Sequence, residues 1–376
     1  MKLTISDGVL EKVELDDETE VTIPYGVVSI GRNAFSRCML LKSLVVPDSV
    51  TDTGNDAFYK CESLVSINLP DSITSIGVRA FKGCSSLANI TIPASLTLIG
   101  SEMFMDCVSL TSVTIPASVK NIWYNAFVGC SSLTGLIVNS ENLVYTDIDG
   151  VLFDKNKETI LIYPISREKS EYEIPAGVTM VGFWAFWECR TLKSVIIPDS
   201  VTEICESAFY SSEELKSVTM PDSITVIGDK AFELCGSLID KELPKNLKHI
   251  GNYAFRACKS LKSISIPESV KMIGMNAFAD CSSLKNITLP HGISEIQEGT
   301  FAGCTSLKNI SIPESVTKIG SRAFSSALAN LTIPGSVKSI HAEAFRDCSK
   351  KLVIHAPTGS FAVKFASKNK IKFETI

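Results

Sequence analysis

The chain has 376 residues, of which 45% are hydrophobic and 20% are charged, and its formal net charge is −5. No apolar run approaches the roughly 18 residues that a membrane-spanning helix needs. No basic block favours nucleic acid or anionic lipid. We therefore expect a protein partner, no nucleic acid and no membrane insertion; the oligomeric state is not indicated.

The N-terminal stretch "MKLTISDGVL" lacks the apolar core of a secretory signal. By sequence the chain is cytoplasmic, or it lies at the cell surface if a signal was removed. "LTISDGVLEKVEL" alternates as a β-hairpin with Asp7-Gly8 as its turn. We expect residues 1–20 to form a hairpin that caps the first open edge.

One unit then repeats along the chain. Its Phe column recurs every 23 residues at Phe35, Phe58, Phe81, Phe104 and Phe127, resumes with the same step from Phe186 to Phe324, and ends at Phe345. Every proline except Pro164 keeps this period. Such a period is the signature of a repeat architecture.

Within one copy, "LKSISIP", the residues Leu261, Ile264 and Ile266 are spaced as the inward positions of a half-buried strand. Pro267 lacks a backbone N–H and should end that strand. Side chains between the apolar positions, such as Ser263 and Ser265, should face outward. Across the copies these outward columns are polar, with lysine and acidic columns beside them. They are interpreted either as a recognition surface or as solvated strand residues.

The rest of the copy should also point into the core. Val270 and Ile273 are expected to be buried, with Gly274 allowing a tight bend. Phe278 and Cys281 should lie inside, on a short helical turn. A unit this short cannot bury its own apolar face, whereas stacked units form a continuous core, so a solenoid of roughly fourteen coils is predicted.

Eleven of the 12 cysteines share one repeat column, three residues after the Phe. Side chains in such a column run parallel, which is the wrong geometry for a disulfide. We predict buried free thiols that act as small hydrophobes, a state that fits a reducing compartment. Disulfides and a metal site are the alternatives, and no CxxC or histidine cluster supports the metal.

The repeat is interrupted at residues 134–173, which we expect to be an irregular insertion with a hairpin. Aromatic residues flank it at Trp123, Tyr124, Phe183, Trp184 and Trp187. One interpretation is an exposed aromatic interaction patch, the composition that interfaces favour. The alternative is that these rings pack against the insertion's own apolar residues 151–153.

The insertion also contains "DIDGVLFDKNKE", whose scattered carboxylates raise the question of calcium. An EF-hand loop places its glycine later than Gly150. Asp149-Gly150 is better explained as a hairpin turn. No cofactor and no metal ligand is predicted.

At the C-terminus, "GSFAVKFASKNKIKF" predicts an amphipathic helix over residues 360–368, followed by a short strand. Phe361, Phe365 and Ala366 should face the last coil. Residues 358–376 would then be a helix-strand cap, and residues 1–376 one solenoid.

The unit "IPxSVxxIGxxAFxxCxxLxxI" resembles the BspA-like leucine-rich repeat. The insertion "VYTDIDGVLFDKNKETILIYP" and the C-terminal tail also resemble segments of that family. The resemblance implies a leucine-rich repeat solenoid, wound as a right-handed superhelix with a parallel β-sheet on the concave face. It also implies adhesin-like binding of host or cell-surface proteins, although no export signal or wall anchor is visible here.

The sequence contains no motif that indicates enzymatic activity. No GxSxG, HExxH, phosphate loop or GxGxxG occurs, and the four histidines fall in different repeat columns. We expect a non-catalytic protein-interaction module, adhesin-like, that binds an extended or protein partner along the concave face or near the insertion. The alternatives are an intracellular scaffold or regulatory repeat protein, and an array without a specific ligand.

Overall fold

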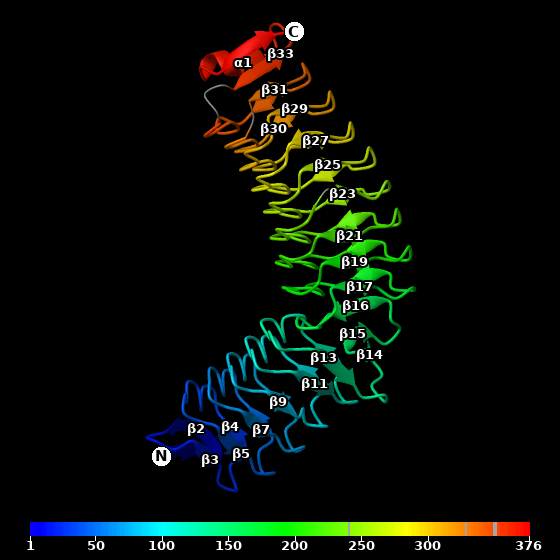
Figure 1. Cartoon of the computed structure of the whole chain (residues 1–376). Helices are drawn as coiled ribbons and strands as arrows, with labels where there is room; N and C mark the ends of the chain where they lie inside the picture. The colour runs from blue at the N-terminus through cyan, green and yellow to red at the C-terminus, as the bar shows by residue number, and fades with distance from the viewer. Residues whose placement is uncertain (240, 328, 349–351) are drawn as a thin grey trace. The chain divides into compact units, whose positions relative to one another are not determined.

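The computed structural model describes residues 1–239, 241–327, 329–348 and 352–376. It forms two compact units, Met1–Glu168 and Lys169–Ile376. Each unit is a β-solenoid, and the chain has about 16 turns spaced about 23 residues apart (Figure 1). The predicted solenoid is therefore confirmed. The number of turns is higher than expected because strands β13 (Gly135–Val138) and β33 (Val353–Ala356) begin coils that lack the repeated Phe.

The first ladder of strands in each unit is formed by the short segment before the repeat proline, in which an apolar residue lies between two outward-facing residues. In the first unit it comprises β3 (Glu20–Thr22), β5 (Ser43–Val45), β7 (Ser66–Asn68) and β9 (Asn89–Ile90), then β11 (Ser112–Ile115) and β13. In the second unit it comprises β17 (Glu171–Glu173), β19 (Ser194–Ile196), β21 (Ser217–Thr219), β23 (Lys241–Glu242), β25 (Ser263–Ser265), β27 (Asn286–Thr288), β29 (Asn309–Ser311), β31 (Asn330–Thr332) and β33. The paired strands are parallel and in register, so each column of the repeat becomes a row of neighbouring side chains.

A second ladder, which the sequence analysis did not predict, comes from the two residues before the repeat glycine. The first unit contains β4 (Ser29–Ile30), β6 (Asp52–Thr53), β8 (Ser75–Ile76), β10 (Leu98–Ile99) and β12 (Asn121–Ile122). The second contains β18 (Met180–Val181), β20 (Glu203–Ile204), β22 (Val226–Ile227), β24 (His249–Ile250), β26 (Met272–Ile273), β28 (Glu295–Ile296), β30 (Lys318–Ile319) and β32 (Ser339–Ile340). Val270 and Ile273 are buried, as expected.

The segment around the repeated Phe is a series of turns, and the predicted short helical turn there is wrong. Backbone N–H groups in these turns donate to the next coil, as in Phe255 N–H to Ala277 O at 2.8 Å and Ala257 N–H to Ala279 O at 2.8 Å. To reach that coil, residues two before and two after the Phe take positive φ, including Tyr253 (58°) and Ala257 (58°). Inter-coil hydrogen bonds therefore outweigh the cost of a left-handed conformation in residues other than glycine.

The repeat glycines are required by close stacking of coils and not by a bend. Gly251 and Gly274 have no positive φ, but a Cβ on Gly251 would lie 2.5 Å from the backbone nitrogen of Asp229. A Cβ on Gly274 would lie 2.5 Å from the nitrogen of Asn252. Any side chain in these positions would push two coils apart, so the proposed role of Gly274 in a tight bend is corrected.

The core of each unit is a stack of the repeated phenylalanines. Phe255 is fully buried, and its ring centroid lies 5.3 Å from that of Phe232 and 5.4 Å from that of Phe278. The other inward positions of the same repeat, Leu261 and Ile264, are also buried. Their burial removes a continuous strip of apolar surface from water, which is the main stabilising term of the fold.

The insertion contains an antiparallel set, β14 (Tyr145–Ile148), β15 (Val151–Asp154) and β16 (Thr159–Ile162). The β14–β15 turn is the predicted Asp149-Gly150, with φ values of 53° and 76°. Ahead of it lies Asn142, whose side chain is fully buried. Its Nδ2 donates to the carbonyls of Pro116 (2.8 Å) and Val119 (3.0 Å). Its Oδ1 accepts from the N–H groups of Val144 (2.9 Å) and Tyr145 (2.8 Å).

The two chain ends carry the hairpin and the helix expected from sequence. Strand β1 (Lys2–Ser6) pairs antiparallel with β2 (Val9–Glu14), and helix α1 (Phe361–Lys368) precedes β34 (Lys372–Thr375). Ala366 is buried and Phe365 lies edge-on to Phe345. Phe361 is exposed, so its predicted packing is wrong; Ala362, one residue later, is buried instead because it shares a helix face with Ala366.

Candidate functional site

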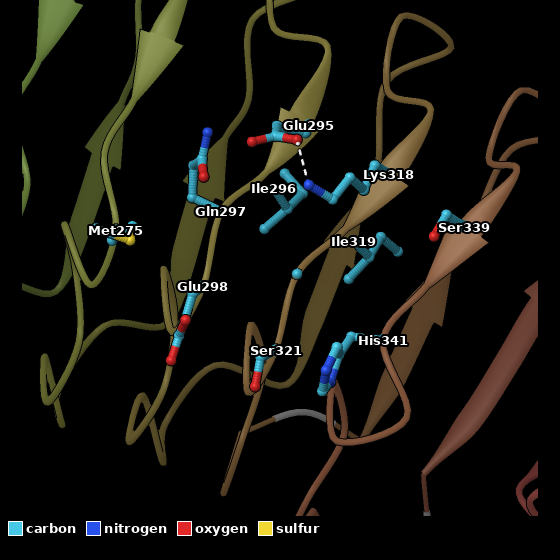
Figure 2. A pocket seen from close by; sticks show the side chains of 11 residues that line it. Met275, Glu295, Ile296, Gln297, Glu298, Lys318, Ile319, Ser321, Ser339 and His341 are labelled. Carbon is cyan, nitrogen blue, oxygen red and sulfur yellow. Dashed lines mark ion pairs between the residues drawn. The ribbon is translucent and has the colours of Figure 1, made fainter.

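A polar groove crosses the second ladder of the second unit. Its volume is about 330 Å³, and Gly320 lines it together with Ile296 and Ile319, whose side chains are almost fully buried. The polar side chains around it come from three successive coils (Figure 2): Glu295, Gln297 and Glu298 from the β28 coil, Lys318 and Ser321 from the β30 coil, and Ser339 and His341 from the β32 coil. Lys318 Nζ lies 3.2 Å from Glu295 Oε2. Sequence analysis missed this groove, although glutamine and histidine break the glycine column there.

The predicted aromatic residues of the first unit are Trp123 and Tyr124, directly after β12. Their side chains are 47% and 46% exposed. The ring centroids are 6.3 Å apart with a 46° angle between planes. Trp123 stands in the glycine column and its backbone N–H donates to Ile99 O at 3.0 Å. Its backbone thus continues the solenoid while its side chain remains partly in solvent.

The predicted aromatic residues of the second unit are Phe183, Trp184 and Trp187. Phe183 is 51% exposed, whereas both tryptophans are half-buried. Trp184 stacks on Trp187 with centroids 4.7 Å apart, and Trp187 stacks on Tyr210 at 4.6 Å. The two tryptophans therefore belong to a stacked row of rings.

Tyr210 was missed by the sequence analysis. Its signal was its place one coil after Trp187 in the same repeat column. Burial raises the pKa of the Tyr210 hydroxyl, and the nearby Glu233 carboxylate raises it further. The indole N–H of Trp187 is buried and has no hydrogen-bond partner among the described residues.

The carboxylates of the insertion serve the local fold. Asp147 accepts from the N–H of Val138 at 2.8 Å, and Asp149 Oδ2 lies 2.7 Å from a guanidinium nitrogen of the buried Arg167. Asp154 accepts from the N–H of Thr159. In the described part of the chain, no group of three or more His, Cys, Asp or Glu side chains is placed to hold a metal ion. These contacts explain why acidic residues occur in the hairpin without invoking calcium.

Polar columns that follow the proline also have structural roles. Asp222 Oδ1 accepts from the N–H of Lys245 in the next coil at 2.8 Å, and this bond lowers the pKa of Asp222. The serine hydroxyl of Ser223 donates to Val201 O at 2.7 Å, and Ser269 repeats this with Leu247 at 2.7 Å. Asp222, Ser223 and Ser269 therefore tie successive turns together.

Outward residues of the first ladder are exposed in most coils. Near its C-terminal end they line a shallow hollow of about 710 Å³ that includes Asn309, Asn330 and His355. Asn330 Nδ2 donates to Asn309 Oδ1 at 3.1 Å. This pair of side chains thus bonds along the ladder.

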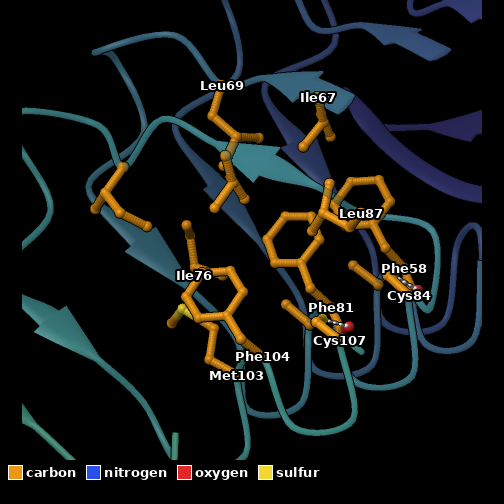
Figure 3. Close-up of a cluster of buried hydrophobic side chains, with 14 of the residues drawn as sticks. Phe58, Ile67, Leu69, Ile76, Phe81, Cys84, Leu87, Met103, Phe104 and Cys107 are labelled. Carbon is orange, nitrogen blue, oxygen red and sulfur yellow. Dashed lines mark hydrogen bonds between the residues drawn. The ribbon is translucent and has the colours of Figure 1, made fainter. Parts of the chain in front are cut away.

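Ten of the eleven repeat cysteines are buried thiols, among them Cys84 and Cys107 (Figure 3), and Cys348 is half-buried. Cys84 donates to the carbonyl of Phe58 at 3.1 Å, and Cys107 to that of Phe81 at 3.1 Å. Burial raises the pKa of each, which keeps the thiol protonated and chemically inert. Ser212 takes the place of cysteine in one coil and donates to Phe186 O at 2.6 Å. Most residues of the column are therefore small hydrogen-bond donors, whereas Ala327, in another coil, shares only the small size.

None of the described helices is long and apolar enough to cross a membrane.

Known proteins share this repeated geometry. A family model described as a BspA type leucine rich repeat region matches residues 5–134, 166–258 and 225–352. The chain belongs to the BspA-type leucine-rich repeat family. The family implies a protein-interaction scaffold, and leucine-rich repeat proteins of this kind are generally non-enzymatic. The search of curated proteins found no match.

Solved structures agree with this BspA-type fold. A leucine-rich repeat protein from Eubacterium ventriosum matches with a TM-score of 0.73 and 24% identity, over 83% of this chain and 91% of that one. A leucine-rich repeat protein from Bacteroides ovatus matches with a TM-score of 0.60 and 27% identity, over 100% and 97%. The pneumococcal vaccine antigen PcpA matches with a TM-score of 0.61 and 22% identity, over 95% and 79%.

Proposed function

We propose that this BspA-type protein is a non-catalytic, adhesin-like binding module for host or cell-surface proteins. The observation that carries the proposal is the exposure of large aromatic side chains beside the insertion, 47% for Trp123 and 51% for Phe183. Aromatic residues are enriched at protein interfaces and dominate their energetics. Trp123 belongs to the first unit and Phe183 to the second, and the proposal assigns a binding contribution to each of them.

The five aromatic residues differ in exposure. Trp123, Tyr124 and Phe183 each have about half of the side chain in solvent. Trp184 and Trp187 are held in the stack with Tyr210, so we assign them to supporting Phe183 from below the surface. Binding energy is expected to come mainly from the three more exposed rings.

A binding assay tests this assignment. The full chain is passed over a panel of immobilised extracellular-matrix proteins, collagen, laminin and fibronectin, and the variants Trp123→Ala and Phe183→Ala are compared with it. Each change should weaken the interaction at least about tenfold, since truncating an interface anchor costs about 2 kcal/mol or more. Tyr25→Ala is the matched control, because Tyr25 is an aromatic residue that is 87% exposed on a regular coil. Equal losses for all three variants, or binding to none of these proteins, would contradict the proposal.

One observation favours an intracellular scaffold as the second candidate. The repeat thiols are free and all but Cys348 are buried, and such a set of cysteines is typical of reducing compartments. Treating intact producing cells with an external protease separates the two candidates. Loss of the chain supports the adhesin-like module. Protection in the soluble fraction supports the scaffold and removes the adhesin-like proposal.

A further inference from the structure

Within the described residues, the second ladder is interrupted once between the regular coils of each unit. In the first unit, β8 is the last strand of one sheet and β10 the first of the next. In the second unit, the same interruption lies between β26 and β28. Gly77 and Gly274, which follow the last paired strands, each donate an N–H to the coil before at 2.9 Å. Among the described residues, Gly100 and Gln297, which come next in that column, have no such bond, so the ladder is open at both steps.

The first ladder is interrupted one coil after each of these steps. Strand β9 pairs with β7, but β11 belongs to another sheet and contacts this coil through the isolated bridge between Thr91 and Thr114. Strand β27 pairs with β25, and β29 belongs to another sheet. The coils 89–100 and 286–297 are therefore paired to the coil before through their first strand and to the coil after through their second. We call these two segments the crossed coils.

The phenylalanine stack is also looser where each crossed coil meets the coil before it. The ring of Phe104 lies 5.6 Å from the ring of the preceding coil, against 5.0 Å one step earlier. The ring of Phe301 lies 6.0 Å from the ring of the preceding coil, against 5.4 Å one step earlier. Each is the largest spacing between consecutive repeat phenylalanines in its unit. The side-chain core thus widens at the same two steps at which the backbone ladder opens.

Two further residues show this loosening. A Cβ on Gly100 would have only a side-chain atom of Met103 within 4 Å, at 3.7 Å. A Cβ on Gly77, one coil earlier, would lie 2.3 Å from the backbone of Gly54. In the second unit, the inward residue Ile287 of the crossed coil is only half-buried, although the other inward isoleucines of the first ladder are buried. Coils 89–100 and 286–297 therefore pack less closely on their neighbours than regular coils do.

The turns around the repeated Phe stay bonded at both steps. Phe81 N–H donates to Met103 O at 3.0 Å, and Phe278 N–H donates to Thr300 O at 3.0 Å. The first ladder is also paired there, through β7 with β9 and β25 with β27. Each crossed coil is thus attached to the coil before it along two of its sides and is open along the third.

We propose that the crossed coils are hinges, at which the coils on either side tilt relative to one another within a unit. Tilting at any paired step would break hydrogen bonds between the second strands of two coils, and at the open steps these bonds are absent. Hinges concentrate a change of shape in a few residues while packed blocks on either side move as rigid bodies. The curvature of each unit is thereby adjustable at one place. This property goes beyond the proposed binding module and does not depend on it.

Pulsed EPR with pairs of spin labels tests the hinge of the second unit. Val226→Cys with Lys318→Cys places labels on outward positions of the second ladder, four coils apart and on either side of the open step. Met180→Cys with Met272→Cys is the matched control, because it also spans four coils but lies in one continuous sheet. Four spacings of about 4.8 Å separate each pair by about 19 Å. Both pairs are made in a Cys348→Ser chain, whose other native thiols are buried.

The distance distribution of the pair across the open step should be at least about twice as wide as that of the control, because the hinge moves on the timescale of collective motions and the continuous sheet does not. Equal widths would overturn the proposal for the second unit.

Two measurements test the first unit. The amide of Gly100 should exchange its hydrogen at least about 100-fold faster than that of Gly77, which is held in the paired ladder. Gly100→Ala should leave Tm nearly unchanged, because its Cβ meets only the flexible end of Met103. Gly77→Ala is the matched control and should lower Tm strongly or prevent folding, because its Cβ would overlap backbone. Equal exchange at the two amides, or equal loss of Tm in the two variants, would show a closed step and overturn the proposal for this unit.

Discussion

The thiol of Cys258 donates a hydrogen bond to the carbonyl oxygen of Phe232 at 3.2 Å. The same bond joins Cys281 to Phe255 at 3.1 Å. A core aromatic residue and a cysteine 26 positions later are thus tied across neighbouring coils. Protonated thiols are therefore part of how coils are held together, and their ionisation should oppose folding.

This arrangement predicts alkaline unfolding. Burial raises the pKa of the Cys130 and Cys304 thiols to about 12, against about 8.5 in an unfolded chain. Because the pKa is higher in the folded state, the stabilising contribution is complete below about pH 8.5 and is lost as the pH rises toward 12. Each such thiol should lower the free energy of unfolding by about 1.4 kcal/mol per pH unit within that window.

Urea unfolding at about pH 8 and about pH 10 measures this slope. Cys130→Ser is the control, because serine keeps a donor, as Ser212 does, but does not ionise in this range. The variant should show a shallower loss of stability than the parent. A parent whose stability is constant between these two pH values would contradict the prediction.

The phenylalanine stack predicts a large cost for truncation. Phe255→Ala should lower the free energy of unfolding by about 3–5 kcal/mol, because a fully buried ring between two others is replaced by a cavity. Phe361→Ala, at a side chain that is 42% exposed, should cost about 1 kcal/mol or less. Similar midpoints of urea unfolding for the two variants would show that the stack is not the core.

Asn142 should be among the least replaceable polar residues. Asn142→Ala removes four hydrogen bonds at a fully buried position and should cost about 3–5 kcal/mol, since several backbone groups lose their partners. Asn139→Ala, at an exposed residue that accepts one bond from Glu141, should cost about 1 kcal/mol or less. Thermal melts of both variants measure the difference. Equal shifts in Tm would mean that Asn142 does not hold the insertion.

The glycine column predicts a contrast between two alanine substitutions. Gly251→Ala should be strongly destabilising because its new Cβ would meet backbone atoms 2.5 Å away. Gly236→Ala should be neutral or slightly stabilising, because no atom lies within 4 Å of its Cβ position and its φ is not positive. Soluble yield and Tm report both changes, and a tolerated Gly251→Ala would argue against the close stacking of coils.

At Leu234, where φ is 65°, we expect glycine to be favoured over alanine because the backbone is left-handed. Leu234→Gly should be more stable than Leu234→Ala by about 1 kcal/mol, because only glycine adopts this conformation without steric cost. Urea unfolding of the two variants decides the point. An alanine variant as stable as the glycine variant would show that the turn relaxes to negative φ.

The sequence predicted burial correctly where a single physical reason explains the residue type in a repeat column. Leu261, Ile264 and Phe278 were predicted to be buried from spacing alone, and they are. The turn around Phe278 was mispredicted because residues such as Asn276 and Asp280 adopt positive φ only under the constraint of the neighbouring coil. Gly299 and Gly303 fill the same two columns in the next coil, and glycine there is a compositional sign of a left-handed backbone.

Candidate sites were harder to predict. Exposure of Trp123 was one of two alternatives that the sequence left open. Stacking of Trp187 on Tyr210 depends on columns that lie side by side only after folding. The polar groove depends on the missing side chain of Gly320, which lies between Gln297 and His341 in the glycine column. Such a site is formed by three coils together, so no single copy of the repeat contains its pattern.

The hydrogen bonds between turns also determine how each unit would respond to tension. Bonds such as Phe255 N–H to Ala277 O run from one coil to the next, so a force along the stack loads the outermost coil first. Each coil that peels away replaces a spacing of about 4.8 Å with an extended chain of about 75 Å for 23 residues. Each unit is therefore expected to lengthen in discrete steps under load, acting as an extensible tether that can absorb mechanical work before the remaining coils are disturbed.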